Sequence, residues 1–242
     1  NKDVVFEDRN RNIIIIAEEI IYKKNNEKVI ATGNVSITDK SKNINIRTNK
    51  ILYSKNENLI SATDKVNYTD KNKGIIINAG EISYYKGQEK LFARSNVIIN
   101  DINKNIKIDT DEITYLVNEN KFFTQGNTLA DINSKYEFKS KNVSFLQNEM
   151  RLYSSEKTII KDLDNTLFEL DSFDYNINDE YLKGTKITVI ENSNLPSPER
   201  NKLYFDSGFF DLKNNNFTTG AAKIHLKKNL FDRSENDPRI YG

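Results

Sequence analysis

Apolar and polar residues alternate along most of the chain, in short runs separated by polar segments. Ile44 and Ile46 enclose an asparagine, and Val66 and Tyr68 enclose another. A period of two, with β-branched and aromatic residues enriched, indicates strands that bury one face. The segments between the runs, such as residues 54–58, are rich in Lys, Asn and Glu, which is typical of hairpin loops. Helical spacing is nearly absent, so we expect an all-β chain.

A repeat of about 31 residues organises this pattern, a period typical of architectures built from stacked units. Tyr22, Tyr53, Tyr84 and Tyr115 recur at this spacing without deviation. The same spacing relates Ile20, Ile51, Ile82 and Ile113, then Ala31, Ala62 and Ala93, then Val35, Val66 and Val97, and finally Asp39, Asp70 and Asp101. Four copies therefore run from about residue 4 to residue 131, and looser copies continue at a slightly shorter spacing. Each copy is expected to hold about three strands of roughly five to seven residues.

One copy cannot bury its apolar face alone, so the copies must stack. We expect one domain, residues 4–226, that forms an elongated, twisted β-jellyroll or solenoid. Pro196 and Pro198 mark a surface loop at residues 191–202, because proline removes a ladder donor. Residues 227–242, with Pro238, are predicted to be a C-terminal connector. The expected copies are residues 4–38, 39–69, 70–100, 101–131, 132–162, 163–190 and 203–226.

Composition excludes several classes of protein. The chain has 36 Lys and Arg residues against 35 Asp and Glu residues, interspersed throughout, whereas a nucleic-acid binder is expected to carry a basic stripe. The longest apolar run, Ile13–Ile16, is far shorter than the roughly 20 residues of a membrane-spanning helix. Cysteine is absent, which excludes disulfides and thiolate metal sites.

The chain offers little chemistry for catalysis. His225 is the only histidine, and its place in an alternating run indicates a solvated strand residue. Neither a cluster with zinc-ligand spacing nor a glycine-rich phosphate loop is present. Asp39, Asp70 and Asp101 each follow a strand end, where Asp favours turns by bonding its own backbone. We therefore predict no enzyme, no catalytic residue, no metal and no cofactor.

The repeat is similar to that of a known family. Residues 17–22, Ala-Glu-Glu-Ile-Ile-Tyr, followed by residues 30–39, Ile-Ala-Thr-Gly-Asn-Val-Ser-Ile-Thr-Asp, resemble the repeat of the lipopolysaccharide-transport β-jellyroll (OstA-like) family. That family has the pattern A-x-x-hydrophobic-x-Y followed by A-x-G-x-V. Later copies keep Val66 and Val97 but lose the glycine, which Gly126 restores. The resemblance covers residues 4–224 and is closest to the N-terminal periplasmic domain of the outer-membrane assembly protein LptD.

The resemblance implies two sheets that form a V-shaped groove, with acyl chains of lipopolysaccharide inside and its sugars outside. It also implies a location in the periplasm, in association with the outer membrane. Core packing alone accounts for an apolar face, and only the resemblance gives it a lipid-binding role; small residues such as Ala62 and Ala93 would leave room for the lipid. The expected lipid-groove residues are Ile15, Tyr22, Ala31, Val35, Ile37, Ile46, Tyr53, Ile60, Ala62, Val66, Tyr68, Ile77, Tyr84, Leu91, Ala93, Val97, Ile99, Ile108, Tyr115 and Phe122.

Terminal strands of such a stack are unpaired and invite a further strand. Val4, Phe6, Ile13 and Ile15 are the expected docking edge for a homologous, LptA-like bridge protein. We expect an LptD-type domain because no membrane anchor is seen in the polar N-terminal segment and because residues 236–242 suggest a junction to a further domain. As a part of LptD, the chain would also have an outer-membrane barrel and its lipoprotein as partners, and we expect no nucleic acid.

The main alternative is a secreted or surface β-helix, either an adhesin segment or a polysaccharide-binding module, with a polysaccharide lyase as its enzymatic form. Such proteins also repeat, and a wealth of Asn suits stacked ladders. Parallel β-helices usually have shorter periods and inward Asn ladders, whereas the asparagines here fall mostly in the loops. An intracellular scaffold is a third alternative. A β-helix would have a filled core, and a jellyroll would have a groove that lipid can enter.

Overall fold

The computed structural model describes residues 3–227 and 239–241. Within these residues the regular structure is β-strand, apart from four single-turn 3-10 helices: η1 (Arg9–Arg11), η2 (Lys24–Asn26), η3 (Lys86–Gln88) and η4 (Ser197–Glu199). The prediction of an all-β chain of stacked strands is therefore confirmed. Most of the predicted connector, residues 228–238 and 242, lies outside the described residues. The chain divides into two compact units, Asn1–Gly126 and Asn127–Gly242.

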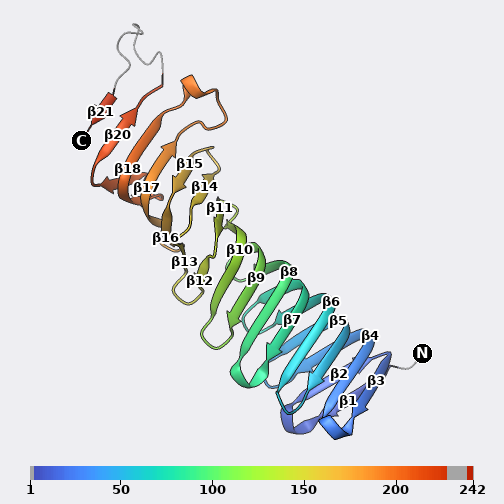
Figure 1. The fold of residues 1–242 in the computed structure, drawn as a ribbon. Helices are drawn as coiled ribbons and strands as arrows, with labels where there is room; N and C mark the ends of the chain where they lie inside the picture. The colour runs from blue at the N-terminus through green and yellow to red at the C-terminus, as the bar shows by residue number, and fades with distance from the viewer. Residues whose placement is uncertain (1–2, 228–238, 242) are drawn as a thin grey trace. The chain divides into compact units, whose positions relative to one another are not determined.

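From β4 to β9 the first unit is a series of antiparallel hairpins in which strands adjacent in sequence are also adjacent in space (Figure 1). Its repeat has two long strands per copy, so the prediction of three short strands was wrong. The strands are β1 (Val4–Asp8), β2 (Ile13–Ala17), β3 (Glu19–Lys23), β4 (Lys28–Asp39), β5 (Ile44–Ser54), β6 (Leu59–Asp70), β7 (Ile75–Tyr85), β8 (Lys90–Asp101), β9 (Ile106–Leu116) and the first part of β10 (Lys121–Ile132).

Each long strand of the first unit is interrupted near its middle by a change of register. In β4 the pairing with β5 shifts between Thr32 and Val35, and β6 shifts against β7 between Thr63 and Val66. The buried positions of β5 change phase at the same level, from Ile44, Ile46 and Thr48 to Ile51 and Tyr53. Since a bulge bends its strand, the bulges divide the sheet into two halves that turn the same apolar side inward.

The two halves face each other, because turns from opposite ends of the strands are in contact. A straight strand of 11 residues, the length of β5, would span about 36 Å. Nevertheless, Asp39, at the end of β4, forms an ion pair with Lys86, which follows β7 at the opposite edge of the sheet. The sheet must therefore fold over along the line of bulges, so that it forms two layers around one apolar interior.

The glycine of the repeat has a defined conformational role in this bend. Gly33 has φ = 76° and Gly126 has φ = 88°, both in the left-handed region that glycine adopts without a steric penalty. In the copies that lack glycine, Asp64 (φ = 75°) and Ser95 (φ = 70°) take the same conformation. The bulge thus recurs once in every copy, whether or not glycine is present. Where a residue with a side chain occupies the left-handed position, that conformation is sterically unfavourable.

The second unit keeps the two-layer plan but breaks most strands at the bend. One layer contains β11, β14, β15, β20 and β21, the other contains β12, β13, β16 and β19, and β17 and β18 pass through both. The strands are β11 (Tyr136–Lys141), β12 (Ser144–Leu146), β13 (Arg151–Ser154), β14 (Thr158–Asp162), β15 (Leu167–Leu170), β16 (Ser172–Asn176), β17 (Tyr181–Ile190), β18 (Lys202–Asp211), β19 (Asn216–Thr219), β20 (Ala222–His225) and β21 (Arg239–Tyr241).

Two segments of the second unit test sequence expectations about loops. Residues 191–201, between β17 and β18, contain only η4, in agreement with the loop expected around Pro196. β21 pairs with β20 through Ile240 and Ile224, so the described end of the predicted connector is a strand.

The bulge geometry predicts opposite effects for two substitutions. Gly33→Val places a β-branched residue at positive φ and drives its Cβ into the side chain of Glu18, so we expect a loss of about 2 kcal/mol of stability. Ser95→Gly relieves the left-handed strain at the equivalent position and should raise stability by about 0.5 kcal/mol. Thermal unfolding of both variants measures the difference, and equal effects of the same sign would contradict this role of the bulge.

Candidate functional site

The predicted lipid-groove residues form the interior between the two layers of the first unit. Each of them is at most 3% exposed, with the exception of Tyr22, which is 42% exposed near the N-terminal edge of the sheet. Ala31, Ala62 and Ala93 belong to this interior too, and their small side chains are covered by the neighbouring rows. The interior of the first unit is thus packed and closed to solvent, and these residues are brought together as one continuous apolar core.

The turns from opposite ends of the strands meet at one edge of the two layers, which we call the mouth. Polar side chains form a seam that closes it. We define the seam as the contact between the turns that follow β1, β4, β6 and β8 and the turns that follow β3, β5, β7 and β9. Within each edge, the turns are joined by backbone hydrogen bonds, such as Lys40 N–H to Asn12 O at 2.9 Å and Lys86 N–H to Asn58 O at 2.9 Å. These bonds continue the order of the strands beyond their ends, because each turn donates to the next.

Side chains cross the seam at a constant offset of 47 residues along the chain. Asp8 pairs with Lys55 at 3.7 Å, and Asp39 pairs with Lys86. Alongside them, Lys42 pairs with Glu89 at 2.5 Å. Asp8 and Asp39 are almost fully buried, so the lysine charges compensate carboxylates that water cannot reach. The seam therefore places ion pairs on the outer side of the mouth and apolar side chains of the core directly inside it.

We call each aspartate and the residue 47 positions after it, which face each other across the seam, one rung. The third rung lacks the charge compensation of the first two. The repeat column of Lys55 and Lys86 continues with Val117, so Asp70 faces an apolar residue. Asp70 is 2% exposed and accepts backbone N–H groups from Asn72 and Lys73, at 3.0 and 3.1 Å. The Lys73 ammonium donates to the Val117 carbonyl oxygen instead of forming an ion pair with Asp70. Burial raises the pKa of the Asp70 carboxyl and lowers the pKa of the Lys73 ammonium.

Tyrosine hydroxyls lie directly beneath this seam. The Tyr53 hydroxyl donates to the Asp8 carboxylate at 3.2 Å. The hydroxyls of Tyr68, Tyr84 and Tyr115 are buried and have no hydrogen-bond partner within the described residues. Burial raises the pKa of each of these three phenols, and that of Tyr53, above its ordinary value. All four therefore stay protonated and remain hydrogen-bond donors at neutral pH.

In the second unit the mouth is closed at one rung and open at the next. Lys135 pairs with Glu180 at 2.5 Å, and the Tyr136 hydroxyl donates to the same carboxylate at 3.1 Å. Burial raises the pKa of Tyr136 to about 12. At the next rung the turn of residues 162–166 stands opposite that of residues 211–215, and no ion pair within the described chain joins them.

A cavity of about 450 Å³ opens at this unjoined rung. Its deep wall consists of Phe168, Val189, Phe205 and Phe210, which are at most 6% exposed and belong to the interior of the second unit. At the rim, the Phe217 ring is 49% exposed and lies with its centroid 5.3 Å from that of Phe205. The apolar interior of the second unit is therefore accessible from outside through an aromatic opening of the size of a small-molecule site.

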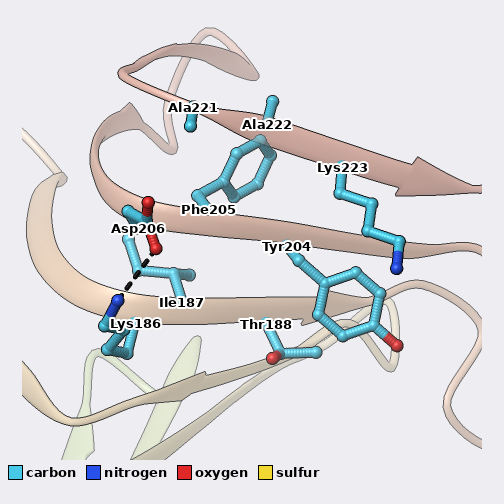
Figure 2. A pocket seen from close by; sticks show the side chains of 9 residues that line it. All are labelled: Lys186, Ile187, Thr188, Tyr204, Phe205, Asp206, Ala221, Ala222 and Lys223. Atoms are coloured by element: carbon cyan, nitrogen blue, oxygen red, sulfur yellow. Dashed lines mark hydrogen bonds and ion pairs between the residues drawn. The ribbon is translucent and has the colours of Figure 1, made fainter. Parts of the chain in front are cut away.

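Two other hollows are shallower or more polar. One, of about 480 Å³, lies over β17, β18 and β20, where Figure 2 shows the Phe205 ring beside Ala221 and Ala222. At its edge the Lys186 ammonium forms an ion pair with Asp206 at 2.9 Å. The other, of about 470 Å³, lies on β7 to β10 and includes Phe92. Neither reaches as many buried apolar side chains as the opening at the mouth.

The N-terminal edge differs from the sequence expectation. Ile13 and Ile15 lie in β2, which pairs with β1 on one side and with β4 on the other, and both are completely buried. Strands β1 and β3 each have one paired side within the described chain, so they provide the free edges. Val4 is exposed and Phe6 is half-buried in β1, which keeps these two residues at the expected docking edge.

The turn aspartates and His225 show no catalytic arrangement. Asp39 accepts the Ser41 N–H at 3.0 Å and Asp101 accepts the Lys104 N–H at 3.1 Å, which confirms the turn role expected for them. His225 packs its ring 5.5 Å from that of Tyr204 and is half-buried, so it is less solvated than expected. Within residues 3–227 and 239–241, His, Asp and Glu side chains form no group of three that could hold a metal. The described residues include no helix of the length and hydropathy needed to cross a membrane.

The seam residues were missed by the sequence analysis, although the sequence carries a signal for them. Lys55 and Lys86 are separated by one period of the repeat, as are Arg11, Lys42 and Lys73, and Asp8 continues the column of Asp39. In the apolar pattern alone, these columns have the character of ordinary loop residues. A search for charged columns, in addition to apolar ones, would have found them.

The chain is similar in structure to a solved protein, although its sequence matches neither a family model nor a curated protein. The crystal structure of LptH from Pseudomonas aeruginosa, described as the LptA-homologous periplasmic component of the lipopolysaccharide transport device, aligns with a TM-score of 0.44. The sequences are 13% identical, and the alignment covers 49% of this chain and 85% of that chain. The function proposed for this chain rests on its own residues.

The seam predicts a strong dependence on Lys86. Lys86→Met leaves Asp39 buried without its cation, so we expect a loss of about 2 kcal/mol in the free energy of unfolding. Adding Asp39→Asn should restore most of this loss, because the amide oxygen still accepts from Ser41. Lys50→Met, at an exposed position in β5, serves as the matched control and should change stability little. Urea unfolding measures all three, and a loss of equal size in the control would contradict the pairing.

The uncompensated carboxylate predicts a pH dependence. Because burial raises the pKa of Asp70, the folded protein binds this proton more readily than the unfolded chain. The penalty is absent below the ordinary aspartate pKa of about 4, grows as pH rises from there to the folded-state pKa, and is complete above it. Asp70→Asn should therefore be more stable than the wild type by about 1 kcal/mol at pH 7 and equal to it below about pH 4. Unfolding curves at the two pH values provide the measurement, and an equal gap at both would contradict it.

Proposed function

We propose that this chain is a non-enzymatic, lipopolysaccharide-binding scaffold of the periplasm, which carries acyl chains between its two layers toward the outer membrane. The observation that carries this proposal is the aromatic opening into the apolar interior of the second unit. The repeat that resembles the lipopolysaccharide-transport β-jellyroll family supports it. The proposal includes the finer identity, a periplasmic domain of an LptD-type assembly protein.

The physical chemistry of the opening suits hydrocarbon. Each buried methylene contributes about 0.8 kcal/mol, so an acyl chain gains most from a long apolar surface. Phe168, Phe205 and Phe210 provide such a surface inside the mouth, while Asp162, Asp211 and Lys213 stand at its rim. An amphiphile with its chains inside and its polar head at the turns would satisfy both regions.

The first unit offers the same apolar rows beneath a closed seam. Acyl chains reach these rows only when the two layers separate, which breaks the ion pairs of Asp8 and Asp39. The predicted lipid contacts from Ile15 to Phe122 therefore depend on opening of the seam. In the closed form described, the same residues serve as the core.

The free edges of β1 and β3 are the proposed docking surface for a homologous, LptA-like bridge protein. Val5 and Ile21 are exposed on these strands, and unpaired backbone groups accept a further strand by β-augmentation. If the full protein is of the LptD type, its outer-membrane barrel and lipoprotein complete the set of partners.

The β-helix alternative is not supported by the strand pairing. The strand pairs from β1–β2 to β8–β9, and those from β10–β11 to β20–β21, are antiparallel, whereas a parallel β-helix pairs its strands in parallel. The adhesin and lyase forms of that alternative lose their structural basis.

The proposal predicts that a charge at the rim of the opening weakens lipid binding. Phe217→Asp should lower the affinity for lipid A at least about fivefold, because the charged group borders the path of the acyl chains. Ile159→Asp is the matched control, since Ile159 is 43% exposed on β14 and does not line the opening. Titration of lipid A monitored by intrinsic tyrosine fluorescence compares the two. Absence of lipid A binding by the wild type would overturn the proposed function.

A further inference from the structure

Three buried phenols of the first unit have hydroxyl groups that the fold itself leaves unsatisfied. Tyr68, Tyr84 and Tyr115 have essentially no exposed surface, and their hydroxyls have no hydrogen-bond partner within the described residues. Tyr53, one copy before Tyr84, has the same burial but donates its hydroxyl to Asp8. Buried hydroxyls without partners are unfavourable and uncommon, so a cluster of three requires a reason.

Packing alone does not supply that reason. Phenylalanine would fill the same space without the unsatisfied hydroxyl, and the chain uses it where the column continues: Phe145 stands one copy after Tyr115 and is 1% exposed. The chain therefore tolerates Phe at this position of the repeat, yet it keeps tyrosine at Tyr84 and Tyr115.

The three phenols lie together, beneath the rung at which Asp70 faces Val117 instead of a lysine. The rings of Tyr68 and Tyr84 meet edge to face with centroids 6.2 Å apart, and the Lys73 ammonium lies 5.7 Å from the centre of the Tyr115 ring. Above them Asp70 lacks the cross-seam lysine that Asp8 and Asp39 possess. Separation of the layers at this rung would break the hydrogen bond from Lys73 to the Val117 carbonyl oxygen but no ion pair of Asp70. The phenols would then lie at the boundary between the polar turns and the apolar rows.

We propose that the hydroxyls of Tyr68, Tyr84 and Tyr115 form a hydrogen-bonding site for the carbonyl oxygens of ester or amide linkages in an acyl-chain ligand. This inference rests on the proposed function and specifies one site for it. A hydrocarbon chain that enters between the layers carries its linkage carbonyl to the inner side of the seam. That carbonyl loses water there and needs a donor, and each phenol supplies one O–H.

The test compares an ester with its ether analogue. 1-Monomyristoylglycerol and 1-O-tetradecylglycerol have the same chain length and head, and only the ester has the carbonyl. Their affinities for the wild type, for the Y68F/Y84F/Y115F variant and for Tyr53→Phe are measured by displacement of N-phenyl-1-naphthylamine. The triple variant removes only hydroxyl groups, so we expect its melting temperature to equal or exceed that of the wild type. The single variant Tyr84→Phe provides the same comparison if the triple variant does not fold.

We expect the wild type to prefer the ester about tenfold and the triple variant to lose this preference while keeping its affinity for the ether. Tyr84→Phe should lose about threefold of the preference, and Tyr53→Phe, whose hydroxyl bonds to Asp8, should keep it all. Unchanged ester preference in the triple variant would overturn the phenol site and leave the proposed function standing. Failure of the wild type to bind either lipid or lipid A would overturn the proposed function, and the site with it.

Discussion

The apolar rows of this protein can be buried only if the sheet folds back on itself. A flat antiparallel sheet with one apolar face would leave that face in water, and nothing else in the first unit covers it. The bulges at positions such as Gly33 and Asp64 bend every long strand at the same level, so the two halves of each strand face each other. Once this bend is present, the core, the mouth and the seam follow from it.

The bend places groups of opposite character at the same edge. Turns rich in Lys and Asp from both ends of the strands meet, while Ile and Tyr side chains lie directly beneath them. Ion pairs such as Asp39–Lys86 hold the layers together, but their formation requires removing carboxylates from water, which is unfavourable. Where the repeat replaces a lysine with Val117, or where turns meet without a cation between them, the same edge becomes the weak point of the closure.

These departures from a fully satisfied structure coincide with the features that suggest binding. The unsatisfied phenols, the buried carboxylate of Asp70 and the opening lined by Phe205 and Phe210 would each be removed by a sequence optimised for stability alone. Violations of the rules for packing and for satisfying polar groups are expected mainly at functional sites, where a ligand can supply the missing contacts. A scaffold for hydrocarbon needs an interior that is apolar and still separable, and a perfectly sealed barrel would have no entrance.

The sequence by itself determined the all-β class, the period of the repeat and which rows of residues are buried. Alternation and repeat spacing are local properties, and each copy of the repeat shows them independently. Ile37, Ile77 and Ile108 are buried as that pattern requires. Only the tertiary structure decided that the strands run unbroken through a bulge, that Ile13 and Ile15 lie inside the sheet, and that Asp39 meets Lys86. Those outcomes depend on where the sheet bends and on which turns then come together. The spacing of the repeat marks the charged columns, but it does not state which two columns face each other once the sheet has folded over.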